Sequence, residues 1–198
     1  TYVLTSTITI TNGLNLRSVN GPVVTFIDGN ASVRCLDLTN GPIISGLTIS
    51  NGFADSGAGV YFRGGGIVSN SVIVGCGTVT NGYGGGAYMA KGGLLAFSTL
   101  TLNHSGYDGA GVYLDSGGVA TSCTVSANST TGYAFGGGGV YLCRGGLVIN
   151  SSIINNYTLY DGGGAYLDTS GTVTNCTIAA NHCGGNGAGV QMYNEGAG

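Results

Sequence analysis

Gly137-Gly-Gly-Val-Tyr-Leu142 is one copy of a short phrase that the chain repeats, and this repetition decides the fold. The phrase has a glycine-rich start, a small aliphatic residue, usually a tyrosine, and a large aliphatic residue. Its copies begin at Gly57, Gly84, Gly109, Gly137, Gly162 and Gly187, which are 27, 25, 28, 25 and 25 residues apart. A fixed period in this range predicts a solenoid in which each repeat forms one turn.

Two further runs of strand-forming residues follow the phrase within each repeat, for example Gly146-Leu-Val-Ile-Asn-Ser151 and Ser152-Ile-Ile-Asn-Asn156. Three short strands in a repeat of about 25 residues predict an all-β parallel β-helix, a β-solenoid of about eight coils. We therefore expect one domain over residues 1–198. Residues 57–198 form its regular coils, and residues 1–56 form about two irregular ones.

Side chains alternate inward and outward along a strand, so equivalent residues of successive coils should form columns spaced about 4.8 Å apart. The aliphatic members are expected inside, and five tyrosines are expected outside, in a ladder on the first strand: Tyr61, Tyr88, Tyr113, Tyr141 and Tyr166. Four asparagines should form a second ladder at a turn, where stacked amides bond along the axis: Asn103, Asn128, Asn156 and Asn181.

Charged residues are scarce, with five Lys plus Arg and eight Asp plus Glu in 198 residues. The net charge of −3 and the lack of basic clusters argue against a nucleic-acid partner. The apolar runs are too short to span a membrane. The first residue is not Met and the chain opens within a strand, so we expect part of a longer chain, or a subunit that stacks end to end.

The repeats resemble the right-handed, single-stranded parallel β-helix proteins of the pectin-lyase-like superfamily. Within that group they are similar to bacterial surface proteins with polymorphic-membrane-protein-type repeats, which carry a Gly-Gly-Ala-Ile phrase and a Phe-x-x-Asn phrase. Gly85-Gly-Ala-Tyr88 and Gly163-Gly-Ala-Tyr166 correspond to the first phrase. Cys176-Thr-Ile-Ala-Ala-Asn181 corresponds loosely to the second, with Cys for Phe and one extra residue. The resemblance covers residues 36–192 and implies a right-handed coil.

The pectin-degrading members of that superfamily use clustered charged side chains on one sheet face. The resemblance therefore makes Asp115 and Asp168 the candidate catalytic carboxylates. They hold equivalent positions two coils apart, or about 9.6 Å, near the upper limit for an inverting carboxylate pair. The simpler interpretation is that both are solvated turn residues, since no basic cluster surrounds them to bind an acidic polysaccharide. No cofactor and no metal site are expected.

The tyrosine ladder, with further aromatic residues in the loops before it, predicts a broad aromatic surface that meets a glycan or another protein chain. The leading hypothesis is an extracellular or cell-surface structural or adhesive element, without catalytic activity, that self-associates or binds glycans. A polysaccharide lyase or hydrolase is the alternative, and ice binding through outward threonines is a weaker one. Asn30, in the sequon Asn30-Ala-Ser32, is the candidate glycosylation site.

Overall fold

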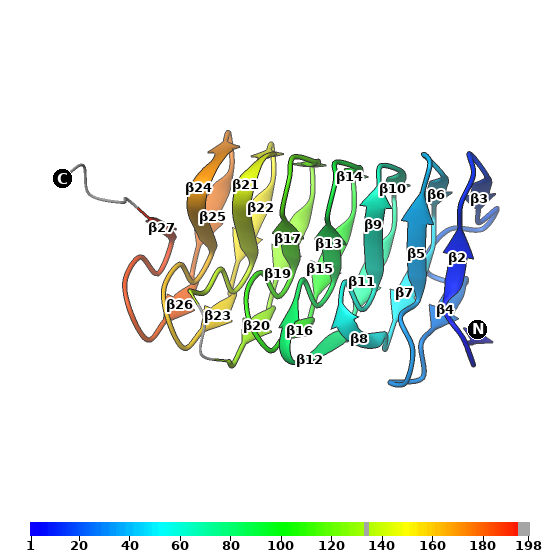
Figure 1. Ribbon diagram of the computed structural model, residues 1–198, viewed down its shortest axis with the longest axis horizontal. Coiled ribbons are helices and arrows are strands. Elements are labelled where there is room, and N and C mark those ends of the chain that lie inside the picture. Colours follow the sequence, from blue (N-terminus) through cyan, green and yellow to red (C-terminus); the bar gives the residue numbers. More distant parts are fainter. Residues whose placement is uncertain (133–134, 194–198) are drawn as a thin grey trace.

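The computed structural model describes residues 1–132 and 135–193, and these form a rod of stacked turns with the first and last described strands at opposite ends of its long axis (Figure 1). Every element of the described residues is a β-strand, and none of them forms a helix that could span a membrane. Each strand pairs in parallel with its equivalent one turn away. The predicted all-β solenoid is thus confirmed.

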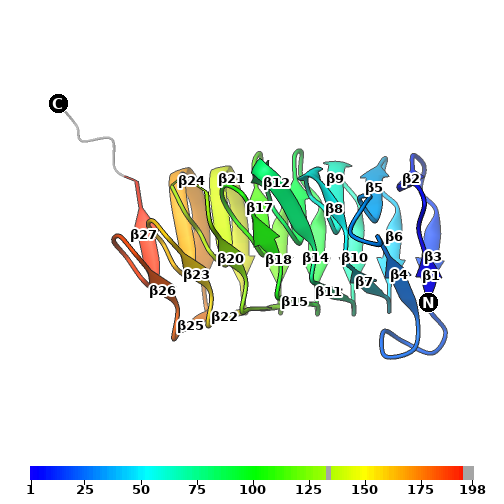
Figure 2. The ribbon, with the colours of Figure 1, turned by 90° about the horizontal axis from the view of Figure 1, so that it is seen from below.

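Four faces surround the axis (Figure 2). The first face holds β2 (Ile8–Ile10), β5 (Leu36–Thr39), β9 (Val60–Gly64), β13 (Ala87–Met89), β17 (Val112–Leu114), the starts of β21 (Val140–Ile149) and β24 (Ala165–Thr174), and β27 (Val190–Met192). The second holds β3 (Asn15–Arg17), β6 (Ile43–Ser45), β10 (Ile67–Ser69), β14 (Leu94–Ala96), β18 (Val119–Thr121) and the ends of β21 and β24.

The third face holds β1 (Tyr2–Val3), β4 (Phe26–Asp28), β7 (Thr48–Ser50), β11 (Val72–Val74), β15 (Thr99–Thr101), β19 (Thr124–Ser126), β22 (Ser152–Ile154) and β25 (Thr177–Ala179). A short fourth face holds β8 (Phe53–Ser56), β12 (Gly77–Tyr83), β16 (His104–Ser105), β20 (Ser129–Thr130), β23 (Tyr157–Thr158) and β26 (His182–Cys183). Three strands per coil were expected. The fourth was missed because most of its strands have only two residues and no alternating pattern.

The core consists of the predicted aliphatic columns. On the first face Val60, Ala87 and Val112 are aligned and fully buried. On the third face Ile73, Leu100 and Val125 are aligned and fully buried in the same way. Side chains of the same kind therefore pack on one another along the axis. No disulfide crosslinks the turns, since all six cysteines are free.

The buried asparagine ladder is confirmed. The backbone N–H and the side-chain Nδ2 of Asn103 both donate to Oδ1 of Asn128, each at 3.0 Å. Asn128 makes the same two bonds to Asn156, and its Nδ2 also donates to the carbonyl oxygen of Leu100. The turns pack too closely for a side chain at Gly111, because a Cβ there would lie 2.6 Å from the carbonyl oxygen of Gly139, 2.6 Å from Cγ1 of Val125 and 3.0 Å from Nδ2 of Asn128. These close contacts explain why glycine occupies the third position of the phrase at Gly111.

Left-handed backbone marks the two ends of each third-face strand from β7 to β25. Asn70, Asn150 and Asn175 hold one of these corners in three turns, with φ of 49°, 54° and 49°. In one turn the same two corners carry Phe97 and Leu102, with φ of 49° and 56°, and their side chains are 64% and 63% exposed. Asparagine and glycine tolerate this conformation far better than bulky residues do, so this turn is more strained than the preceding one, whose corners carry Asn70 and Gly75.

We expect replacement of Asn128 by Ala to lower the free energy of unfolding by about 3 kcal/mol or more, because buried N–H and C=O groups on both neighbouring turns lose their partners. Urea denaturation measures the change. Asn155→Ala is the matched control, since Ala127 and Ala180 already occupy its corner in other turns. Equal losses in the two variants would contradict a special role for the ladder.

Phe97→Asn should raise the free energy of unfolding by about 1 kcal/mol, since asparagine removes the left-handed strain at no cost in buried contacts. The control Val79→Asn removes an exposed apolar side chain, 41% accessible, from the extended strand β12. If Val79→Asn stabilises the protein equally, the gain comes from lost surface hydrophobicity and not from the corner.

Candidate functional site

A column of stacked tyrosines runs along the outer side of the first face. Tyr61, Tyr88, Tyr113, Tyr141 and Tyr166 align in register. Their successive ring centroids are 5.0, 5.1, 4.9 and 5.1 Å apart, and the last two pairs lie within 4° and 3° of parallel. Their predicted position outside the aliphatic core is confirmed, because the rings form a separate cluster.

The predicted exposure of this ladder is wrong for three of its members. Tyr113, Tyr141 and Tyr166 are 8%, 2% and 2% exposed, whereas Tyr61 and Tyr88 are half-buried. Two of the aromatic residues that were expected to widen the surface pack against it: Tyr83 lies 5.0 Å from Tyr113, and Phe135 lies 6.0 Å from Tyr166, between ring centroids. Burial raises the pKa of the Tyr113 and Tyr141 phenols. A binding role for the five rings stays a prediction.

A polar column lies beside the tyrosines and contains both predicted carboxylates. Asp115 accepts hydrogen bonds from Arg144 Nη2 at 2.5 Å and from the Tyr88 hydroxyl at 3.1 Å. Asp168 accepts a hydrogen bond from the thiol of Cys143 at 3.6 Å. The turn that carries Cys143 lies between the two aspartates. They are therefore on the same face but do not form one pair of neighbouring carboxylates.

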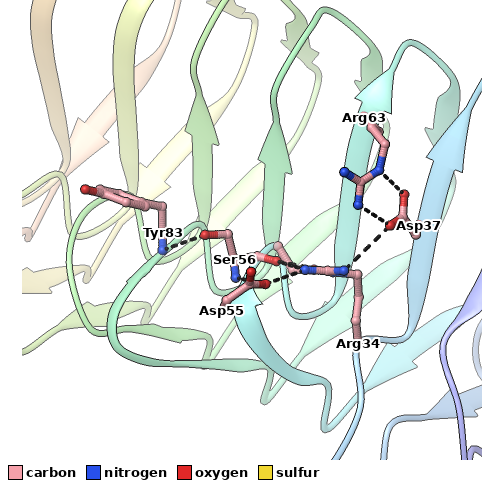
Figure 3. A network of polar contacts seen from close by, with 7 residues as sticks. Arg34, Asp37, Asp55, Ser56, Arg63 and Tyr83 are labelled. Atoms are coloured by element: carbon pink, nitrogen blue, oxygen red, sulfur yellow. Dashed lines mark hydrogen bonds and ion pairs between the residues drawn. The ribbon is translucent and has the colours of Figure 1, made fainter.

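A second polar group, which was not predicted from the sequence, lies at the N-terminal end of the same face (Figure 3). Asp37 occupies the tyrosine column one turn before Tyr61 and is 7% exposed. Arg63 binds its two oxygens at 3.2 and 2.7 Å, and the Arg34 guanidinium lies 3.6 Å away. Both guanidinium groups also lie over the Tyr61 ring, at 4.9 and 4.7 Å. An aspartate in a column of tyrosines is the signal that could have revealed this group.

Arg34 joins this group to the fourth face. Its Nη2 donates to Asp55 at 2.6 Å and to the carbonyl oxygen of Ser56 at 2.9 Å. The Ser56 hydroxyl in turn accepts from the backbone N–H of Tyr83 at 3.4 Å, as Figure 3 shows. The network therefore connects the irregular N-terminal turns to the first regular ones.

Asp108 is the most buried carboxyl near the ladder, at 3% exposure. Burial raises its pKa to about 7, and the charge of Asp168 adds to the rise. Hydrogen bonds from the backbone N–H groups of Gly136, at 2.8 Å, and of Phe135 oppose it. The carboxyl thus ties the loop before β17 to the loop of the next turn.

All seven aspartates of the described residues bond to a residue roughly one turn away in the sequence, at separations of 21 to 29 positions. They are Asp28, Asp37, Asp55, Asp108, Asp115, Asp161 and Asp168, and their partners are Asn51, Arg63, Arg34, Gly136, Arg144, Asn186 and Cys143. Each acidic side chain therefore fastens one turn to its neighbour.

Other possible ligand sites are sparse in the part of the chain that the structure describes. There, no group of three His, Cys, Asp or Glu side chains comes close enough to hold a metal ion. Asn30 is exposed, in a turn after β4, with its backbone N–H donating to Asp28 at 2.8 Å. Its glycosylation stays a prediction.

Residues 5–198 match the family model described as a right-handed beta helix region. No curated protein and no solved structure matches the chain. The specific similarity to polymorphic-membrane-protein repeats receives no support beyond this coarser match.

Asp108→Asn should remove a pH-dependent loss of stability. A carboxyl whose pKa rises from 3.8 to about 7 on folding holds its proton more tightly in the native state. Stability therefore falls as pH rises from about 4 to about 7 and stays low above that. The variant should gain over the wild type with rising pH, by up to about 4 kcal/mol.

Urea denaturation between pH 4 and pH 8 measures this difference. Asp55→Asn, at a side chain that is 82% exposed, is the control and should show no such rise. A constant difference between Asp108→Asn and the wild type over this range would show that burial does not raise the Asp108 pKa.

Proposed function

Because the chain belongs to the right-handed β-helix family, we propose that it serves as a structural β-solenoid without catalytic activity. The observation that carries this proposal is the use of all seven described aspartates as bonds between turns. A catalytic acid or base needs a carboxyl oxygen within hydrogen-bond reach of a substrate. Here the carboxylates accept hydrogen bonds from residues of neighbouring turns, as expected of side chains that stabilise a rigid scaffold.

The polysaccharide-active alternative depends on Asp115 and Asp168. Their side of the rod is the first face, and the spacing of two turns, about 9.6 Å, would leave room for a water molecule between an acid and a base. However, Asp115 is ion-paired with Arg144 and accepts from Tyr88. These contacts favour a structural role for it.

An extracellular or cell-surface position and an adhesive role are part of the same proposal. They are supported by the sequence resemblance to bacterial surface proteins and by a composition rich in glycine and poor in charge, with 41 glycines in 198 residues. Rigid rods of this kind suit stalks and fibres, because each turn adds length without adding a new core.

Asp115→Asn distinguishes the scaffold from the enzyme. We expect it to lower the free energy of unfolding by about 1 kcal/mol, a modest loss because the Arg144 side chain is 64% exposed. We also expect the wild type to release no oligosaccharides from neutral or acidic polysaccharides. Thermal unfolding and product chromatography are the measurements.

Asp168→Asn is tested in parallel, with Asp28→Asn on the third face as the control. The enzyme hypothesis gains if the wild type cleaves a polysaccharide and if Asp115→Asn and Asp168→Asn abolish cleavage at unchanged stability while Asp28→Asn does not. That result would overturn the structural proposal.

A further inference from the structure

The fourth face departs from the repeat in one turn. Its strand β12 has seven residues, whereas the strands on either side, β8 and β16, have four and two. Thr78 pairs with Ala54 and Tyr83 pairs with Ser56, so five residue steps in β12 correspond to two in β8. Irregular pairing of this kind is over-represented beside functional sites.

A cavity of about 270 Å³ lies beside this irregularity. The strands β12, β16 and β20, which are next to one another in Figure 1, supply its lining together with the turns that follow them. Apart from two glycines, the lining residues are Thr78, Thr80, Asn81, His104, Tyr107 and Thr131. Pockets for drug-sized ligands have roughly 300–1,000 Å³, so this cavity suits a smaller ligand.

Packed backbone forms one side of the cavity. A Cβ on Gly106 would collide with the carbonyl oxygens of Val79 and Thr80 in β12. A Cβ on Gly132 would collide with the carbonyl oxygen of Gly106 in the same way. The backbone N–H of Gly106 also donates to the buried Thr78 hydroxyl at 3.0 Å. These contacts fix the wall of the cavity and leave the space beside it open to a ligand.

Two hydroxyl groups orient the His104 imidazole. Its Nδ1 lies 3.5 Å from Oγ of Ser129, and its Nε2 lies 3.2 Å from Oγ1 of Thr131. A neutral imidazole donates from one nitrogen and accepts at the other, so both contacts form at once. The Thr131 hydroxyl keeps hydrogen-bonding capacity for a ligand, because a hydroxyl has one donor and two acceptor sites.

Thr80 and Asn81 carry hydrogen-bonding groups that the protein itself does not use. Both residues are exposed, and within the described part of the chain neither side chain bonds to another residue. The amide of an asparagine offers donors on its nitrogen and an acceptor oxygen. Asn81 can therefore bind two neighbouring hydroxyl groups of one ligand.

Tyr107 adds an aromatic surface to these polar groups. Its ring stacks on Tyr83, with 5.5 Å between the centroids and 17° between the planes. Tyr83 in turn packs on Tyr113 of the tyrosine column at 5.0 Å. The Tyr107 ring is thus held in place before a ligand arrives, which reduces the entropy lost on binding.

The lining selects its ligand by chemistry. None of the described residues that line the cavity is Asp, Glu, Lys or Arg, so a charged ligand gains no ion pair there. Hydroxyl, amide and imidazole groups suit a ligand rich in hydroxyl groups, and an aromatic ring suits one with an apolar face. A sugar ring combines these two properties, because hydroxyls surround its rim and C–H groups cover its faces.

We propose that this fourth-face cavity binds one neutral sugar residue of a glycan. Thr80, Asn81 and His104 bond to the hydroxyl groups of the sugar. Tyr107 contacts its C–H face. The proposal rests on the adhesive role proposed above, and it specifies the class of ligand and a surface outside the tyrosine column.

NMR titrations with the methyl glycosides of glucose, galactose, mannose, fucose and N-acetylglucosamine test the proposal. We expect the wild type to bind at least one of them. Asn81→Ala and His104→Ala should each weaken that binding about tenfold, because the sugar loses a hydrogen-bonding partner. The matched controls are Asn155→Ala, at an exposed corner of the third face, and His182→Ala, in the column of His104 but outside the cavity. Both should bind like the wild type.

Binding of none of these glycosides would overturn the proposal, as would binding that Asn81→Ala and His104→Ala leave unchanged. Tighter binding of the methyl glycoside of glucuronic acid than of every neutral one would also overturn it. Circular dichroism checks that each variant folds, and Thr80→Val, which removes a hydroxyl at similar volume, replaces one that does not. These outcomes are distinct from the test of the scaffold, since a rigid rod that binds no sugar contradicts only the ligand proposed for the cavity.

Discussion

In-register parallel pairing between successive turns is the constraint from which the rest of the structure follows. Every strand bonds to its own equivalent one turn away, so each side chain lies directly over its counterpart. Groups that interact well with copies of themselves can form continuous columns. Aliphatic side chains, tyrosine rings and asparagine amides meet this condition, and these residues form the columns of this chain.

Carboxylates do not meet that condition, because like charges on adjacent strands repel. The aspartates of the regular turns alternate accordingly. Asp108 and Asp115 belong to one turn, Gly136 and Cys143 stand at these positions in the next, and Asp161 and Asp168 follow in the turn after that. In a turn adjacent to each of these aspartates, the equivalent position carries no carboxylate. Each aspartate accepts a hydrogen bond from a group at or near that position.

The period of the glycine phrase was sufficient to predict the β-solenoid, the inward columns and the asparagine ladder, because each follows from alternation along a strand and repetition between strands. The packing of Tyr83 on Tyr113 and of Phe135 on Tyr166 could not be predicted in this way, because the segment before each glycine phrase, which carries both residues, varies between repeats. Arg34 and Asp37 lie before the first copy of the phrase, so the repeat did not predict their contacts with Arg63, which directly follows that copy. Asp115 and Asp168 were placed on the correct face, but the partners that occupy them, Arg144 and Cys143, depend on side-chain geometry.

The asparagine ladder has a direction as well as a pattern. Asn103, Asn128 and Asn156 each donate toward the C-terminal end and accept from the N-terminal side, with Cys76 donating to the first of them. The amide dipoles therefore add along the buried row instead of cancelling, and each polarises the next. The row of side-chain amides therefore has one direction, with Cys76 donating to it at its N-terminal end and Asn181 accepting at its C-terminal end.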